Sequence, residues 1–121
     1  MILDTNILIA YLNGETPVID AISKWRREGR ALFISSVSFA EVLALPTLTS
    51  REVDTVERFL RAFISAPLDN DLAVVAALLK RTYRLKLPDA IIAATALTRK
   101  VPLITRDRQF RRIREIGTFE L

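Results

Sequence analysis

The sequence predicts an α/β fold, specifically a three-layer α/β/α sandwich with a central, mostly parallel sheet. The first observation behind this prediction is that short apolar segments alternate along the chain with longer segments of helical periodicity. Parallel neighbours need crossover helices, so such an alternation favours a parallel sheet. The second is that the 121 residues contain no repeat, low-complexity tract or Gly/Ser-rich linker. We therefore expect a single domain over residues 1–121.

The first elements follow from apolar β-formers and from helix boundary signals. Residues 2–3 predict a strand at the start of the chain, and residues 5–12 have a helical pattern. Pro17 can open a second helix that continues to about Glu28, because proline is favoured in a first helical turn. Residues 31–34 then predict a short buried strand.

Capping signals place the next two helices. Ser35 and Ser36 offer an N-cap for a helix over about 37–45, and Thr49 with Glu52 forms a capping-box pattern for another. The second of these helices is amphipathic, so one of its faces must be covered. Its apolar residues are Val53, Val56, Phe59, Leu60, Phe63 and Ile64.

The remaining segments complete the alternation. Residues 71–83 predict a helix, and Pro88 opens an apolar helix over about 89–99. A buried strand at 103–104 follows, then a helical turn near 109–113 and a weak last strand at residues 118–119.

The composition restricts the possible chemistry and partners. The chain has no cysteine and no histidine, so catalysis must use carboxylates, hydroxyls or amines. Its net charge is +4, and seven of the 18 basic residues fall in one short stretch. That stretch suits a phosphate backbone, although a solvated basic face is the alternative. The seven residues are Arg99, Lys100, Arg106, Arg108, Arg111, Arg112 and Arg114.

The chain shows no sign of a targeting or membrane segment. No cationic stretch precedes an apolar one at its start, and the longest nearly apolar run extends only from Ala90 to Leu97, whereas a span needs about 20 residues. We therefore expect a cytoplasmic protein.

Four acidic residues are placed to meet at one edge of the predicted sheet. Asp4 and Asp107 follow predicted strands, and the carboxyl ends of parallel strands are where sites form. Glu41 lies in the helix after the second strand, and Asp89 lies in the first turn of the apolar helix. Carboxylates brought together repel each other, and this arrangement makes sense around Mg²⁺ or Mn²⁺, which prefer oxygen ligands.

Each acid also has a structural alternative. Asp4 can cap the helix that begins at residue 5, and Glu41 can form a capping box with Ser38. Asp89 can complement a helix dipole, and Asp107 can be a turn residue. Taken singly, none of the four identifies a metal site.

Taken together, four blocks of sequence in this order resemble the PIN-domain family, and more narrowly its VapC-type ribonuclease toxins of toxin-antitoxin pairs. The blocks are Ile-Leu-Asp-Thr-Asn at 2–6, Ile-Ser-Ser at 34–36 with Glu-Val at 41–42, Leu-Pro-Asp-Ala-Ile-Ile-Ala-Ala-Thr-Ala at 87–96, and Leu-Ile-Thr-Arg-Asp at 103–107 with Phe110. Each block supplies one of the four acids. The resemblance covers nearly the whole chain.

The resemblance implies an endoribonuclease that depends on one or two Mg²⁺ or Mn²⁺ ions and hydrolyses RNA phosphodiesters with a metal-activated water. Its implied catalytic residues and metal ligands are Asp4, Glu41, Asp89 and Asp107. Thr5, Asn6 and Thr105 are implied to support these acids by hydrogen bonding.

The resemblance also implies an RNA substrate, a cognate antitoxin protein and a homodimer. We expect Arg106 and Arg108, on either side of Asp107, to bind phosphates near the cleaved bond. The apolar face at 53–64 is a candidate surface for the dimer or the antitoxin, with ordinary core packing as the alternative.

Two other classes of function compete with the nuclease. One is a catalytically silent PIN-like module that binds RNA or acts as an adaptor, which the four intact acids argue against. The other is a phosphoryl-transfer or receiver domain built on Asp4, but the sequence offers neither a second aspartate two residues later nor an obvious lysine partner. Mg²⁺-dependent RNA cleavage that is lost on changing Asp4 distinguishes the nuclease from both.

Overall fold

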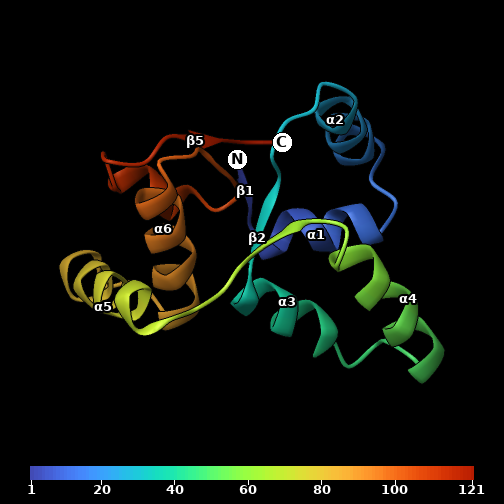
Figure 1. Ribbon diagram of the computed structural model, residues 1–121, viewed down its shortest axis with the longest axis horizontal. Coiled ribbons are helices and arrows are strands. Elements are labelled where there is room, and N and C mark those ends of the chain that lie inside the picture. Colours follow the sequence, from blue (N-terminus) through green and yellow to red (C-terminus); the bar gives the residue numbers. More distant parts are fainter.

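The computed structural model describes all residues from 1 to 121 and contains a five-stranded parallel sheet with helices on both of its faces (Figure 1). The strand order is β3-β2-β1-β4-β5, so the first strand of the chain lies at the centre. The predicted α/β/α sandwich is therefore confirmed. The strands are β1 (Ile2–Leu3), β2 (Phe33–Ser35), β3 (Ile64–Ala66), β4 (Leu103–Ile104) and β5 (Thr118–Phe119).

Six α-helices and one 3₁₀ helix connect these strands. Thr49 and Glu52 form the predicted capping box at the start of α4, and the Ser35 side chain caps α3. No helix combines the length and the apolar character that a membrane crossing requires. The helices are α1 (Thr5–Leu12), α2 (Thr16–Arg27), α3 (Ser36–Leu43), α4 (Ser50–Leu60), α5 (Asn70–Tyr83), α6 (Leu87–Arg99) and the 3₁₀ helix η1 (Arg108–Arg112).

The central strand divides the core into two parts because successive side chains of a strand point to opposite faces. Ile2 lies in a buried cluster with residues of α5, α6 and η1, whereas Leu3 lies in a second cluster with residues of α1, α2, α3 and α4. Figure 1 shows α5 and α6 on one side of the sheet and α1 and α3 on the other. The two layers also contact each other directly through α3 and α6, and Val37 of α3 packs against the cluster of α5 and α6.

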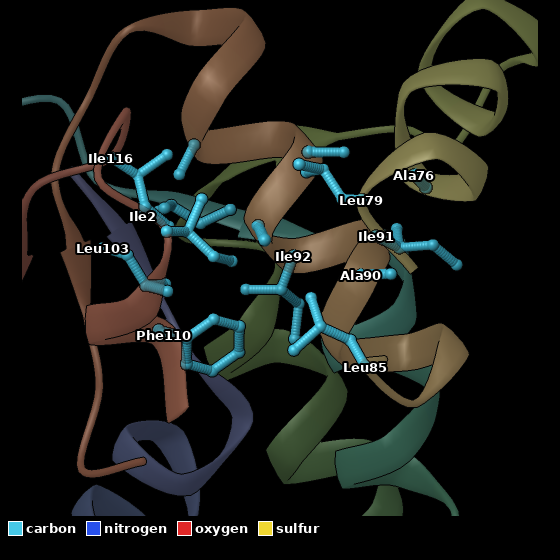
Figure 2. Packing of buried hydrophobic residues seen from close by; sticks show 14 of the residues in the cluster. Ile2, Ala76, Leu79, Leu85, Ala90, Ile91, Ile92, Leu103, Phe110 and Ile116 are labelled. Carbon is cyan, nitrogen blue, oxygen red and sulfur yellow. The ribbon is translucent and has the colours of Figure 1, made fainter. Parts of the chain in front are cut away.

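The helix α6 is the most deeply buried helix of the fold. Every residue from Ala90 to Ala96 is buried, and the alanines among them let neighbouring elements approach closely. Phe110 of η1 has no exposed surface, and Figure 2 shows its ring facing Ile92 and Leu85. The beginning of α6 and the beginning of η1 are thus fixed by the same cluster.

One predicted element is wrong at its end. The sequence pattern continued the amphipathic helix to Ile64, but α4 ends at Leu60 and Ile64 begins the edge strand β3. The Ile64 backbone N–H donates to the carbonyl of Leu32 at 2.9 Å, a sheet pairing that is not visible in local periodicity. Val56, Leu60 and Phe63 are buried in the core, which favours the packing alternative for this apolar face.

Candidate active site

The structure brings the four predicted acids to the carboxyl edge of the sheet. Asp4 directly follows β1, and Asp107 follows β4 and caps η1. Asp89 lies in the first turn of α6, and Glu41 lies in α3. The charges act on one another: those of Asp89 and Asp107 raise the pKa of Asp4, and those of Asp107 and Glu41 raise the pKa of Asp89. The four carboxyl groups therefore share one electrostatic environment.

Asp4 is the most buried of these acids, with only 4% of its surface exposed. Its Oδ1 accepts a hydrogen bond from the Thr5 backbone N–H at 2.8 Å, so the expected helix cap is also present. Its Oδ2 accepts from the Thr105 hydroxyl at 2.6 Å and from Asn6 Nδ2 at 3.1 Å. Burial raises the pKa of Asp4 to about 6, although the hydrogen bonds from Thr105 and Thr5 oppose this increase. The three residues expected to support the site thus surround Asp4.

Thr5 connects Asp4 with Glu41. The Thr5 hydroxyl oxygen lies 2.9 Å from Glu41 Oε1 and 2.9 Å from the hydroxyl of the buried Ser38. The capping-box alternative for Glu41 is wrong. The N-cap of α3 is Ser35, so Ser38 and Glu41 lie inside the helix and not at its first residues. Glu41 is exposed on α3, with its carboxylate held toward the site by Thr5.

Gln109, which no sequence motif predicted as a site residue, connects the other two acids. Gln109 Nε2 donates to Asp89 Oδ2 at 3.1 Å and also to Asp107 Oδ2. The Gln109 backbone N–H donates to Asp107 Oδ1 at 3.1 Å, so the turn role of Asp107 is real as well. Burial is the largest cause of the raised pKa of Asp89, and the hydrogen bond from Gln109 opposes it. The only signal for Gln109 in the sequence was its place two residues after Asp107.

Thr105 joins the two pairs of acids. Its hydroxyl donates to Asp4 Oδ2 at 2.6 Å and accepts from the Asp107 backbone N–H at 3.0 Å. Thr105 is buried; its hydrogen bond to Asp4 is fully buried, and the one from the Asp107 N–H is partly buried. A continuous chain of hydrogen bonds therefore runs from Glu41 through Thr5, Asp4, Thr105, Asp107 and Gln109 to Asp89.

The two arginines expected to bind RNA differ in their surroundings. Arg106 donates to Glu15 through Nη2 and to the Leu121 carbonyl through Nε at 3.0 Å. The Arg108 side chain is exposed and makes no hydrogen bond or ion pair within the protein. A small polar cavity of about 60 Å³ lies beside Asp107, with both arginines in its wall. Arg108 is the guanidinium that remains available to a ligand.

The chemistry of these residues fits a hard divalent cation. All four acids offer oxygen donors, and burial with mutual repulsion raises the pKa of Asp4 and of Asp89, an effect that a cation would relieve. No three of them already surround one point at ligand distance. They instead form two pairs, one joined by Thr5 and one by Gln109.

Comparisons with known proteins identify the family and the fold. The family model of the PIN domain matches residues 1–116. A toxin-antitoxin complex from Klebsiella pneumoniae contains a chain that is 31% identical, with a TM-score of 0.84 over 99% of this chain and 98% of that one. VapBC2 from Rickettsia felis bound to promoter DNA is 17% identical, with a TM-score of 0.83 over 98% and 96% of the chains.

A third solved structure, DNA-bound VapBC from Salmonella typhimurium, is 21% identical, with a TM-score of 0.82 over 98% of this chain and 96% of that one. At these lower identities the likeness concerns the fold. No curated protein sequence matched the chain. The family model covers almost the whole chain, including all four acids. This chain belongs to the PIN domain family.

Proposed function

We propose that this protein is a Mg²⁺- or Mn²⁺-dependent endoribonuclease and the toxin of a toxin-antitoxin pair. The observation that carries the proposal is the convergence of Asp4, Glu41, Asp89 and Asp107 at the carboxyl edge of a PIN-domain sheet. The toxin role is supported by the 31% identical chain, which comes from a toxin-antitoxin complex.

The four acids are the residues that would hold one or two divalent ions. When bound, such ions activate a water molecule and neutralise charge on the leaving oxygen of a phosphodiester. The protein's own contribution is to hold the carboxylates in place. Asp4 receives three hydrogen bonds, from Thr5, Asn6 and Thr105, so its oxygens have a defined orientation before any ligand binds. Glu41 is oriented by Thr5 alone, and Asp89 by Gln109 alone.

Arg108 is the residue that we propose to contact RNA next to the site. It is exposed, unpaired and adjacent to Asp107, so it can bind a phosphate without breaking an existing ion pair. Arg106 would first have to leave Glu15 and the Leu121 carbonyl. We therefore expect Arg108→Ala to reduce the slope of log RNA affinity against log salt concentration by about one unit, the value for one lost phosphate contact. Arg106→Ala should reduce this slope less.

We also propose an antitoxin partner, because the 31% identical chain comes from a toxin-antitoxin complex. A homodimer is proposed from the resemblance to VapC-type toxins alone. We also expect the activity to be cytoplasmic, because the proposed substrate is RNA. Expression of the chain alone should then slow growth, and a cognate antitoxin should relieve the effect.

The decisive experiment is RNA cleavage by the purified protein in Mg²⁺, in Mn²⁺ and in excess chelator. We expect cleavage only with metal, and a loss of about 100-fold or more in Asp4→Asn, Glu41→Gln and Asp89→Asn. Asp20→Asn, an exposed acid on α2, is the matched control and should cleave like wild type. Cleavage in chelator would disprove the metal dependence. RNA binding without cleavage under any of these conditions would instead support the silent binding module.

A further inference from the structure

We propose that Gln109 is a positioning residue whose amide competes with a divalent cation for Asp89 and Asp107, and thereby weakens metal binding at this pair. The inference rests on the proposed metal site, but it does not depend on RNA being the substrate. Its basis is the bridging position of one amide nitrogen between two carboxylates.

The geometry of the bridge is specific. A glutamine NH₂ group has two hydrogens and only donates, and here both hydrogens are used, one by Asp89 Oδ2 and one by Asp107 Oδ2. Since one nitrogen reaches both oxygens, these oxygens are no farther apart than the two hydrogen-bond lengths taken together. The partial positive charge of the NH₂ group thus lies between two negative groups. Gln109 makes no hydrogen bond to Asp4 or Glu41, so its influence is limited to this pair.

The backbone holds the glutamine at this position. Its own N–H donates to Asp107 Oδ1 at 3.1 Å, and the next residue, Phe110, has no exposed surface and is anchored in the core beside α6. Figure 2 shows the Phe110 ring inside this cluster. The helix α6 in turn carries Asp89 in its first turn. The bridge therefore spans two elements whose relative placement is already fixed, and the amide need not order a mobile loop.

The Gln109 amide and a cation would compete for the same two acids. Mg²⁺ prefers carboxylate oxygens, and an ion that used Asp89 Oδ2 and Asp107 Oδ2 as ligands would require the amide to release at least one of these carboxylates. Hydrogen bonds to charged groups are stronger than those between neutral groups, so the amide stabilises the metal-free form more than the loaded form. By linkage, removing it should increase metal affinity.

The test is Mn²⁺ binding to the full chain without RNA, measured by isothermal titration calorimetry. Gln109→Leu removes the donor at similar volume, and we expect it to bind Mn²⁺ about 3- to 10-fold more tightly than wild type. In thermal melts, the metal-free variant should unfold at a lower temperature than wild type, and Mn²⁺ should raise its melting temperature by a larger amount. Asn70→Leu, an exposed amide at the start of α5, is the control and should leave Mn²⁺ affinity unchanged.

A second variant keeps the test valid if Gln109→Leu does not fold. Gln109→Asn retains the amide but is one methylene shorter, so it cannot bridge both acids, and its affinity should lie between those of wild type and Gln109→Leu. Unchanged or weaker Mn²⁺ binding in the folded variants would overturn the inference while leaving the nuclease proposal in place. Absence of Mn²⁺ binding in wild type and in every variant would overturn both.

Discussion

The two halves of the acidic site are built differently. In the Asp4–Glu41 half, the key carboxylate follows the central strand, is 4% exposed and receives three hydrogen bonds. In the Asp89–Asp107 half, both carboxylates lie at helix beginnings, are partly exposed and share one glutamine amide. Burial is the largest cause of the raised pKa in both halves, at Asp4 and at Asp89, but only in the second half does a single side chain, that of Gln109, donate to both acids.

The largest expected effect that separates the halves is the pH dependence of stability in metal-free protein. Burial raises the pKa of Asp4 in the native state to about 6, above its ordinary value of 3.8. The native state therefore binds this proton more tightly than the unfolded state, and the resulting stability is complete below about pH 4 and lost as the pH rises through about 6. At about 1.4 kcal/mol per pH unit, the loss attributable to Asp4 is about 3 kcal/mol.

Urea unfolding of metal-free protein between pH 4.5 and 7.5 covers about 2 kcal/mol of this loss, because the rest falls below pH 4.5. Asp4→Asn should flatten the pH profile by about that amount, while Asp20→Asn, which changes an exposed acid, should leave it unchanged. Parallel profiles for wild type and Asp4→Asn would show that Asp4 does not titrate in this range.

The next effect concerns the residue that joins the halves. Thr105→Val keeps the side-chain shape but removes the hydroxyl that donates to Asp4 and accepts from the Asp107 backbone. Since Asp4 then lacks a buried hydrogen bond and the Asp107 backbone N–H a partly buried one, we expect the free energy of unfolding at pH 7.5 to fall by about 2 kcal/mol. The pKa of Asp4 should also rise, because the Thr105 hydrogen bond lowers it.

Thr105→Ser should restore most of this stability, because it returns the hydroxyl. Thr82→Val, which removes an exposed hydroxyl bonded to the Leu78 carbonyl, serves as the control and should cost much less. A Thr105→Val protein as stable as wild type would mean that the two halves are independent.

The smallest effect is expected within the first half. Thr5→Val removes the hydroxyl near Glu41 and Ser38 but leaves the backbone hydrogen bond to Asp4 intact. Water can replace the lost partner of the exposed Glu41, whereas the hydroxyl of the buried Ser38 loses its hydrogen bond to Thr5, so unfolding should become easier by about 1 kcal/mol. Denaturant titration at pH 7.5 gives this value. If Thr5→Val lowered the free energy of unfolding as much as Thr105→Val, the two hydroxyls would contribute equally to stability, and the proposed difference between them would be wrong.

The sequence predicted most of the fold because its local signals agree with the tertiary structure. Proline in the first helical turn, the capping box at Thr49 and the buried strands at 2–3 and 103–104 all appear where local chemistry places them. The strand β3 was missed because its three residues are mostly exposed and continue a helical apolar spacing. Its identity depends on pairing with β2, a contact between segments far apart in the chain.

The four acids of the candidate site could be predicted from the sequence, but Gln109 could not. Four carboxylates in four ordered blocks of sequence are an informative signal together, although each one alone also fits a helix cap, a helix dipole or a turn. Gln109 carries no charge and belongs to no recognisable pattern in the sequence. Its role arises only because η1 directs its amide between Asp107 and the first turn of α6. Likewise, nothing in the sequence indicated that Arg106 is occupied by Glu15 while Arg108 is free.

The central place of β1 in the sheet has a consequence for the order in which the protein is completed during translation. The strand is synthesised first, yet one of its two neighbours is β4, and the Asp4 backbone N–H donates to the carbonyl of Ile104. Pairings between segments so distant in sequence form late in folding, because a long loop must close first. Asp4 therefore lacks its partners on the growing chain until Thr105 and Asp107 have emerged from the ribosome. A nascent chain halted before this point has the first carboxylate but no assembled site.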